Sequence, residues 1–358
     1  MKSIRTFVQP SQNPRATDVA LMILRGHHGS AIAHIESGAK ILLEATAKED
    51  SQQYPDSAFR NSSIPYAPLS SLTLIFVRLD LQASQILSKR PLYLRQESTD
   101  KESGFHSDIP PSFSSLEESR NAMDYLRNCV MRSLEPITQA NTEVFVQPTQ
   151  NLSNTNRKIC AQNVKRWSMA FEAFLRSQSH ELDLIAQQGV HMLKIHRIML
   201  GMNLDIEDLD VQWTETAWDF YMPEFEAIIS HAASILSFPV QGRKFSLEPG
   251  LVPALYFVAT KCRHGVIRRK AIAFLSAARR QEGVWDSAPV AVVLERYVEL
   301  EEAGLREVRD ADDVPDSQRL SGIDARFDLE GRRAVVYYQR IWGPDNITKL
   351  DIEECIEW

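Results

Sequence analysis

The sequence predicts an all-α protein, a single helical domain of packed antiparallel helices spanning residues 1–358 with at most a short C-terminal β hairpin. Two observations predict this fold class. The long apolar segments repeat their hydrophobic residues at the spacing of a helix that buries one face. The 14 glycines and 17 prolines fall mainly between these segments, where the chain must turn. With 358 residues, 44% of them hydrophobic, the chain can bury a sizeable core.

The first half of the chain predicts helices separated by polar breaks. We expect helices within these ranges, in order: two within 18–47, one over 70–87, one over 117–133 and two over 157–199. Polar breaks separate them at 48–68 and 147–156. The polar run over about 95–118 has the composition of a mobile loop.

Residues 247–302 predict a compact three-helix unit around which the rest of the chain is organised. Its first helix has a continuous apolar face. The basic turn Lys261–Gly265 ends this helix, because cations are favoured at the negative end of the helix dipole and glycine where the chain reverses. Asp286 or Ser287 is expected to cap the third helix.

The residues from about 306 to 358 predict a C-terminal appendage to this domain. The alternation of side chains at 333–338 predicts a short strand. This is the one strand that we predict. The chain is then expected to end in a helical turn toward Trp358.

Composition and charge exclude several classes of protein. No run approaches about 18 uncharged apolar residues, and the N-terminus lacks the apolar core of a secretory signal, so we expect no membrane span. The four cysteines are too scattered for a zinc motif and too few for a disulfide scaffold, which favours a reducing, intracellular compartment. A formal net charge of −7 argues against a nucleic-acid-binding surface built from the chain as a whole.

Two groups of residues resemble metal ligands. The three histidines within 27–34 have no carboxylate at ligand spacing on the same helix face. Residues 310–316 contain the DDxxD string of magnesium and diphosphate sites, but Pro315 interrupts the helix that such a string needs. We therefore expect no metal and no cofactor, while magnesium binding by the aspartates of this string stays open.

Segments spread along the chain resemble one family of fungal proteins. They are GSAIAHIESGAKIL (29–42), FVRLDLQAS (76–84), Trp218-Asp219 followed by Phe225, LYFVATKCRHGVIRRKAI (255–272), EGVWDS (282–287) and LEE (300–302). Over roughly 20–305 the chain resembles the fungal-specific regulatory domain found downstream of the binuclear zinc-cluster module in ascomycete transcription factors. The resemblance implies an all-helical domain that does not itself read DNA. In such regulators a separate module with six closely spaced cysteines contacts DNA, so with four scattered cysteines we expect no direct nucleic-acid binding.

Two functions follow from these observations. The first is a stand-alone, transcription-factor-like protein of fungal secondary metabolism. It would bind an apolar terpenoid or polyketide intermediate in the cytoplasm and catalyse a cofactor-independent cyclisation or pericyclic, Diels-Alder-type step, which needs a shaped pocket and a few hydrogen-bond donors. The alternative is a nuclear transcriptional regulator or co-regulator without its own zinc-cluster module. We favour the first, because the chain begins with a plausible start of its own and lacks the means of DNA binding. A homodimer or a protein partner fits either function.

The expected ligand pocket is lined by large side chains from the most apolar segments. Its catalytic residues would be Tyr221, Tyr256 and Arg263, as hydrogen-bond donors to a substrate carbonyl. Its substrate-binding residues would be Trp167, Met192, Trp218, Trp285 and His264. A structural role competes with each of them, since aromatic stripes at helical spacing mostly form cores. Arg263, Arg268 and Arg269 would then hold helix ends and carboxylates such as Glu302 or Asp286.

Overall fold

Most of the described chain is helical. The computed structural model describes these residues: 32–42, 69–86, 109–133, 154–178, 182–206, 214–238, 244–246, 250–328, 331–342 and 348–358. After a helix over 32–42, its α-helices are α4 (Leu69–Ile86), α5 (Leu116–Ser133), α6 (Asn154–Ser177), α7 (Leu184–Ile206), α8 (Met222–Ser237), α9 (Leu251–Lys261), α10 (Gly265–Ala278) and α11 (Ser287–Glu302). The first of the two helices expected within 18–47, and the expected loop up to residue 108, lie outside the described residues. None of the described helices is both long enough and apolar enough to cross a membrane.

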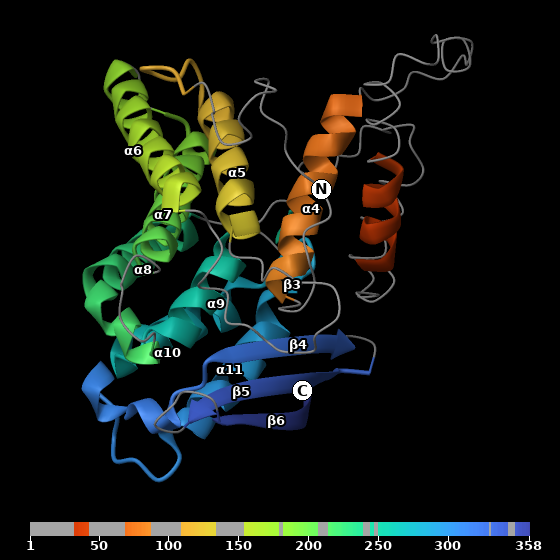
Figure 1. Ribbon diagram of the computed structural model, residues 1–358, viewed down its shortest axis with the longest axis vertical. Helices are drawn as coiled ribbons and strands as arrows, with labels where there is room; N and C mark the ends of the chain where they lie inside the picture. Colours follow the sequence, from red (N-terminus) through yellow and green to blue (C-terminus); the bar gives the residue numbers. More distant parts are fainter. Residues whose placement is uncertain are drawn as a thin grey trace.

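Helices α5, α6 and α7 stand together at one end of the molecule and share a hydrophobic core (Figure 1). On α6 the buried residues Val164, Trp167, Phe171 and Phe174 recur at helical spacing. Trp167 stacks on Phe171 with ring centroids 4.7 Å apart, and its indole nitrogen donates to the carbonyl oxygen of Ser119 on α5 over 2.8 Å. One strip of α6 therefore faces this core and fixes the rotation of the helix.

The chain leading into α5 is more ordered than its composition suggested. Phe113 is buried, with its ring centroid 6.0 Å from that of Trp167. Ser115 Oγ accepts from the backbone nitrogen of Glu118 over 3.1 Å, and the Glu118 carboxylate accepts from the backbone nitrogen of Ser114 over 2.6 Å. These bonds cap the helix N-terminus. The predicted mobile loop therefore gives way to anchored chain before residue 118.

The second and larger core lies between α7, α8 and the three-helix unit. The predicted unit is present as α9, α10 and α11, and Leu251, Leu255 and Val258 of α9 are fully buried in it. Asp286 is the N-cap of α11, its carboxylate accepting from the backbone nitrogen of Ala288 over 3.3 Å. A short 3-10 helix, η2 (Glu215–Tyr221), leads into α8 at the edge of this core.

A small sheet that the sequence did not predict closes the three-helix unit. Its strands are β1 (Lys244–Ser246), β2 (Arg280–Glu282) and β3 (Trp285–Asp286). β2 pairs in parallel with β1 and antiparallel with β3. Gly283, between β2 and β3, has a φ of 55°, and a Cβ there would lie 1.7 Å from Gln82 Oε1 of α4. Glycine is therefore required by both the backbone angle and the approach of α4. Strands this short are too brief to show a periodicity.

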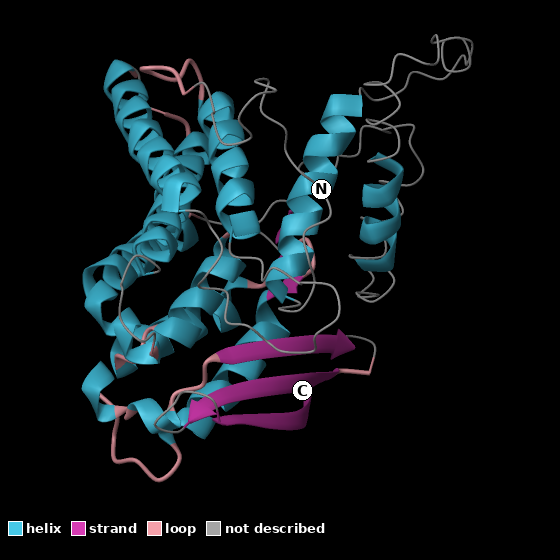
Figure 2. Cartoon of the chain, viewed as in Figure 1, coloured by secondary structure: helices cyan, strands magenta, loops and turns pink. Residues whose placement is uncertain are grey.

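The C-terminal residues form a second antiparallel sheet. Its strands are β4 (Gly322–Asp328), β5 (Arg333–Trp342) and β6 (Thr348–Glu357), in the order β4-β5-β6. Figure 2 shows the three strands side by side beneath the helices. The inner face packs Ala334, Val336 and Tyr338 against Val293 and Tyr297 of α11.

This sheet corrects two predictions. The predicted strand at 333–338 is the start of β5, but it has a neighbour on each side, so the fold is mostly helical rather than all-α with at most one hairpin. The predicted helical turn toward Trp358 is wrong, since β6 runs to Glu357. The reason is visible in the sequence: apolar and charged residues alternate in both GIDARFD and TKLDIEECIE, which is the period of a half-buried strand.

Candidate functional site

The turn between α9 and α10 places a group of charges in the interior. Lys261 Nζ lies 2.9 Å from a carboxylate oxygen of Glu215 on η2. Arg263 Nη1 donates to the other oxygen of Glu215 over 2.8 Å, and Arg263 Nη2 donates to Glu301 Oε1 on α11 over 2.9 Å. Arg268 of α10 donates to the second oxygen of Glu301. These residues, with Tyr297, are called the Arg263 cluster below.

The Arg263 cluster also contacts the chain that enters the C-terminal sheet. Arg263 Nη2 and Tyr297 Oη both donate to the carbonyl oxygen of Leu320, over 2.9 Å and 2.8 Å. The backbone nitrogen of Leu320 donates to Glu301 Oε1 over 2.6 Å. Arg319 pairs with Asp219 of η2 over 2.7 Å. The cluster therefore joins η2, the α9–α10 turn, the end of α11 and the start of β4.

Burial and pairing set the protonation states of this cluster. Arg263, Arg268 and Glu301 are each 0% exposed. Burial opposes the charge of Arg263, but Glu301, Tyr297 and Glu215 outweigh it and raise the pKa of Arg263. Burial likewise raises the pKa of Glu301, but Arg263 and Arg268 outweigh it, so its pKa is lowered. The phenol of Tyr297 has a raised pKa because of burial and the nearby Glu301. Arg263 and Glu301 therefore hold their charges, and Tyr297 its proton, at neutral pH.

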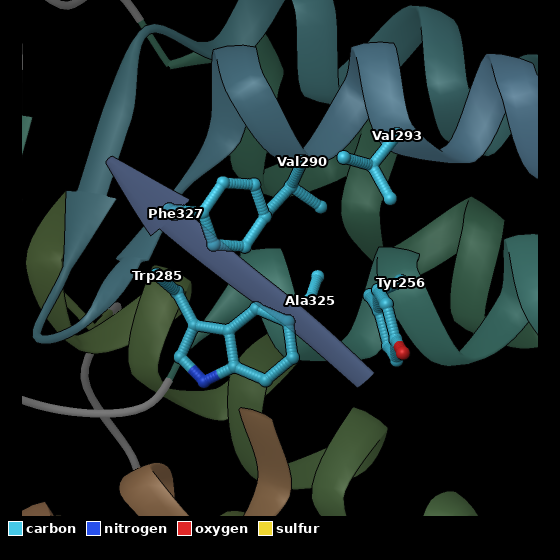
Figure 3. Close-up of a pocket in the computed structure, with 6 residues that line it drawn as sticks. All are labelled: Tyr256, Trp285, Val290, Val293, Ala325 and Phe327. Atoms are coloured by element: carbon cyan, nitrogen blue, oxygen red, sulfur yellow. The ribbon is translucent and has the colours of Figure 1, made fainter. Parts of the chain in front are cut away.

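Two of the predicted pocket residues lie next to each other at a small cavity. The cavity is lined by Tyr256, Trp285, Val290, Val293, Ala325 and Phe327 and lies between α9, α11 and β4 (Figure 3). The rings of Tyr256 and Trp285 meet edge to face with centroids 5.0 Å apart. The cavity measures about 10 Å³, the space of roughly one water molecule, whereas pockets for drug-sized ligands measure roughly 300–1,000 Å³.

The polar groups of this cavity do not converge on its centre. In Figure 3 the indole nitrogen of Trp285 and the hydroxyl of Tyr256 point away from Val290 and Val293. The indole nitrogen is buried and has no hydrogen-bond partner among the described residues. Burial raises the pKa of Tyr256, and Asp324 and Tyr338 raise it further. Tyr256 is therefore a neutral hydroxyl at any physiological pH.

Three further predicted residues face the larger core from its other side. Trp218 of η2 is buried, with ring centroids 5.3 Å from Phe257 and 6.1 Å from Tyr221. Burial raises the pKa of Tyr221, followed by the effect of Asp205. Met192 of α7 packs against the same core. These side chains contribute to packing between η2, α7 and α9.

The remaining predicted residues lie apart from both groups. Trp167 belongs to the separate core of α5, α6 and α7. His264 is half-exposed at the start of α10, with its Nε2 atom 3.4 Å from Asp310. The structure thus distributes the eight predicted residues over the cavity, the Arg263 cluster, two cores and, for His264, the half-exposed start of α10. Their catalytic and substrate-binding roles stay a prediction.

The aspartate string at 310–316 forms two short 3-10 helices instead of one helix face. They are η3 (Ala311–Asp313) and η4 (Asp316–Gln318), with Pro315 between them. Asp310 and Asp313 form a capping box, and Asp313 accepts from the backbone nitrogens of Arg309 and Asp310 over 2.8 and 2.9 Å. Within the described ranges no three His, Cys, Asp or Glu side chains are arranged to hold a metal.

The sequence pointed to the arginines of the Arg263 cluster but missed its carboxylates. Of the two acids expected for them, Glu302 does pair with Arg269 of α10, while Asp286 is the cap of α11. The main partners, Glu215 and Glu301, lie far from Arg263 in the sequence. The signal for Glu301 was its place in the LEE segment that resembles the regulatory domain. Glu215 had no comparable signal.

Comparison with known proteins gives one informative similarity. The chain is 24% identical over 409 aligned residues to the aspercryptin biosynthesis cluster-specific transcription regulator atnN of Emericella nidulans. The alignment covers 88% of this chain and 63% of that regulator, so the chain spans less than two thirds of its relative's length. No protein-family model matches the chain. No solved structure matches it.

Proposed function

We propose that this chain is a transcription-factor-like regulator of a fungal secondary-metabolite gene cluster, acting in the nucleus as a helical regulatory domain. The observation that carries the proposal is the similarity to a cluster-specific transcription regulator over most of the chain. The mostly helical fold agrees with the regulatory domain that the sequence resembles. The proposal reverses the preference for an enzyme that the sequence alone suggested.

The geometry supports a regulatory scaffold in two ways. Arg263 has its guanidinium engaged by two glutamates and a backbone carbonyl in the interior, which leaves it no free donor for a substrate carbonyl at either terminal nitrogen. The cavity at Tyr256 and Trp285 holds about 10 Å³, too little for a terpenoid or polyketide without separating β4 from α9. With four cysteines in the sequence, promoter contact would fall to a partner protein or to sequence beyond this chain.

Deleting the gene in its source fungus tests this function. A regulator requires that transcripts of the neighbouring biosynthetic genes change strongly, and that a tagged copy of the protein is found in the nucleus. The matched control is a strain that carries the wild-type gene at another locus and restores the transcripts. Unchanged transcripts together with an accumulated late intermediate would contradict the proposal.

The cyclase function remains a second candidate because Tyr256 and Trp285 do lie edge to face at a cavity. A substrate would have to open the space between α9 and β4. The Tyr256→Phe variant separates the two functions, since it removes the only polar atom of that side chain while keeping its ring. Loss of a metabolite with normal cluster transcripts in this variant would favour the enzyme.

A further inference from the structure

Helix α6 carries a row of exposed cationic side chains. The row consists of Lys158, Lys165, Arg166 and Arg176, all exposed to solvent. Lys158, Lys165 and Arg176 are separated by 7, 11 and 18 residues, each close to a whole number of turns at about 3.6 residues per turn, and Arg166 flanks this line about a quarter turn to one side. The cations therefore lie along one side of the helix over about 27 Å, at about 1.5 Å per residue. We call this strip the α6 cationic face.

The orientation of this strip is fixed by the other side of the helix. Val164, Trp167 and Phe171 are buried against α5 and α7. In Figure 1, α6 lies at the periphery of the molecule. Because its apolar side is used within the fold, α6 has no free apolar face with which to lie in a lipid surface. The cations therefore face outward from a helix whose rotation is fixed by its buried side.

The cations of this row have no partner carboxylate among the residues described, whereas several other surface arginines do have one. Those arginines each contact a carboxylate: Arg269 with Glu302, Arg296 with Glu299 and Glu354, Arg309 with Glu307, and Arg333 with Asp328. Acidic residues outnumber basic ones in the chain, 47 to 40. Apart from Glu172, the exposed charges of this strip are positive in a chain rich in acids, which favours an acidic partner.

An exposed apolar side chain lies in the middle of the same strip. Met169 is 66% exposed, and it follows Lys165 by four residues and precedes Arg176 by seven, on the same side of the helix. Methionine is a common contact residue at adaptable protein interfaces. Glu172 shares the strip and is also exposed, and its charge would repel any anion placed beside it, so a partner's carboxylates must lie opposite the cations and not opposite Glu172.

We propose that the α6 cationic face docks an acidic amphipathic helix of a protein partner. Aspartates or glutamates of the partner pair with Lys158, Lys165, Arg166 and Arg176, and an apolar side chain at the centre contacts Met169. Charge complementarity selects the partner and speeds its encounter, while the central apolar contact slows its release. This surface is independent of the regulatory function proposed above and does not need it to be correct.

Fluorescence anisotropy with the full chain and a synthetic peptide tests this docking. The probe is a labelled helical peptide of about 18 residues, matching about 27 Å at 1.5 Å per residue, with glutamates along one side and a leucine at their centre. The same peptide with glutamine in place of glutamate is its control. We expect the glutamate peptide to bind, and added salt to weaken the binding.

Charge reversal on the face identifies the contact. The double variant Lys165→Glu with Arg166→Glu should weaken binding of the glutamate peptide by about tenfold or more and gain binding to a lysine version of it. Lys40→Glu, on the exposed side of the helix over 32–42, makes the same charge change elsewhere and should leave binding unchanged. Met169→Ala should weaken binding, whereas Ile185→Ala, which removes an 81% exposed side chain of α7, should not. All five substitutions are at exposed positions, so the four variants should keep the circular dichroism spectrum of the parent.

Three results would overturn the proposal. They are failure of the glutamate peptide to bind at millimolar concentration, binding that the double reversal leaves intact, and equal or tighter binding of duplex DNA or phosphatidylserine vesicles through the same residues. The last would make the strip a general anion surface.

Discussion

The chain uses arginine and lysine in two contrasting ways. In the Arg263 cluster, cations are buried and joined to Glu215 and Glu301, far along the chain. On α6, the same kinds of side chain face water and form no ion pair with a carboxylate in the described structure. A buried charge must be paired within the fold, because desolvation would otherwise unfold it. An exposed charge carries no such requirement and is available to another molecule. Whether an arginine or lysine supports the fold or is available for binding is therefore indicated by its exposure, and not by its residue type.

The largest expected effect is in the interior. Arg263→Met removes the positive charge between two buried glutamates, so the free energy of unfolding should fall by about 3–5 kcal/mol. Urea unfolding followed by circular dichroism measures this loss. The paired control is Arg176→Met on α6, which should keep the parent's stability. If Arg263→Met were as stable as the parent, the cluster would not hold the fold together.

The second effect is a loss of stability in acid. The pKa of Glu301 is lower in the folded protein than its ordinary value of 4.5, so the unfolded chain binds more protons there. The stabilisation is then complete above the unfolded pKa and is lost as pH falls below about 4.5. Unfolding curves at stepped pH should show this slope, and it should be shallower in Glu301→Gln. An equal slope in that variant would assign the acid sensitivity to other carboxyls.

A third and smaller effect is expected at the rim of the cluster. The side chain of Lys261 is 19% exposed and pairs with Glu215. Arg263 continues to contact Glu215 when Lys261 is lost. Lys261→Met should therefore cost about 1 kcal/mol in urea unfolding. If Lys261→Met lowered the free energy of unfolding as much as Arg263→Met, partial exposure of a charge would not reduce the effect of removing it.

The smallest effect on stability is expected on the exposed side of α6. Lys165→Met on the α6 cationic face should change the free energy of unfolding by less than about 0.5 kcal/mol, and added salt should not alter this difference. Thermal unfolding at low and high salt provides the measurement. A clear destabilisation would show that Lys165 supports the fold, and it would remove the reason to treat α6 as a docking surface.

The helices could be predicted because their buried residues recur within single segments. Val164, Trp167 and Phe171 reveal α6 without knowledge of any partner, and the same holds for Leu251, Leu255 and Val258 of α9. The cap of α11 at Asp286 was also predictable, since capping depends on adjacent residues. Residues close together in the sequence were therefore enough to predict these helices and the N-terminal cap of α11.

The sheets and the ion pairs could be predicted only in part. The alternation is regular in β4, whereas two successive glutamates interrupt it in β6, and β1 to β3 have at most three residues each. Arg263 was expected to hold a carboxylate, yet no spacing rule connects it with Glu215 or Glu301, which lie on other elements. The site residues shared only size and hydrophobicity, so the sequence could not tell that Trp167 and Trp285 belong to different cores.

The bond between Leu320 and Glu301 has a consequence for the order of events during synthesis. Residues 215 to 302 supply the charges of the cluster, but Leu320 completes the bonding of Arg263, Tyr297 and Glu301. The ribosome releases these charges before it releases Leu320, so the helices leave the tunnel with this acceptor still missing. Since domains tend to fold from the N-terminus as they emerge, the nascent chain holds an incomplete interior until β4 arrives. A stop codon before residue 320 would thus leave a chain for proteases to remove, although every helix had been made.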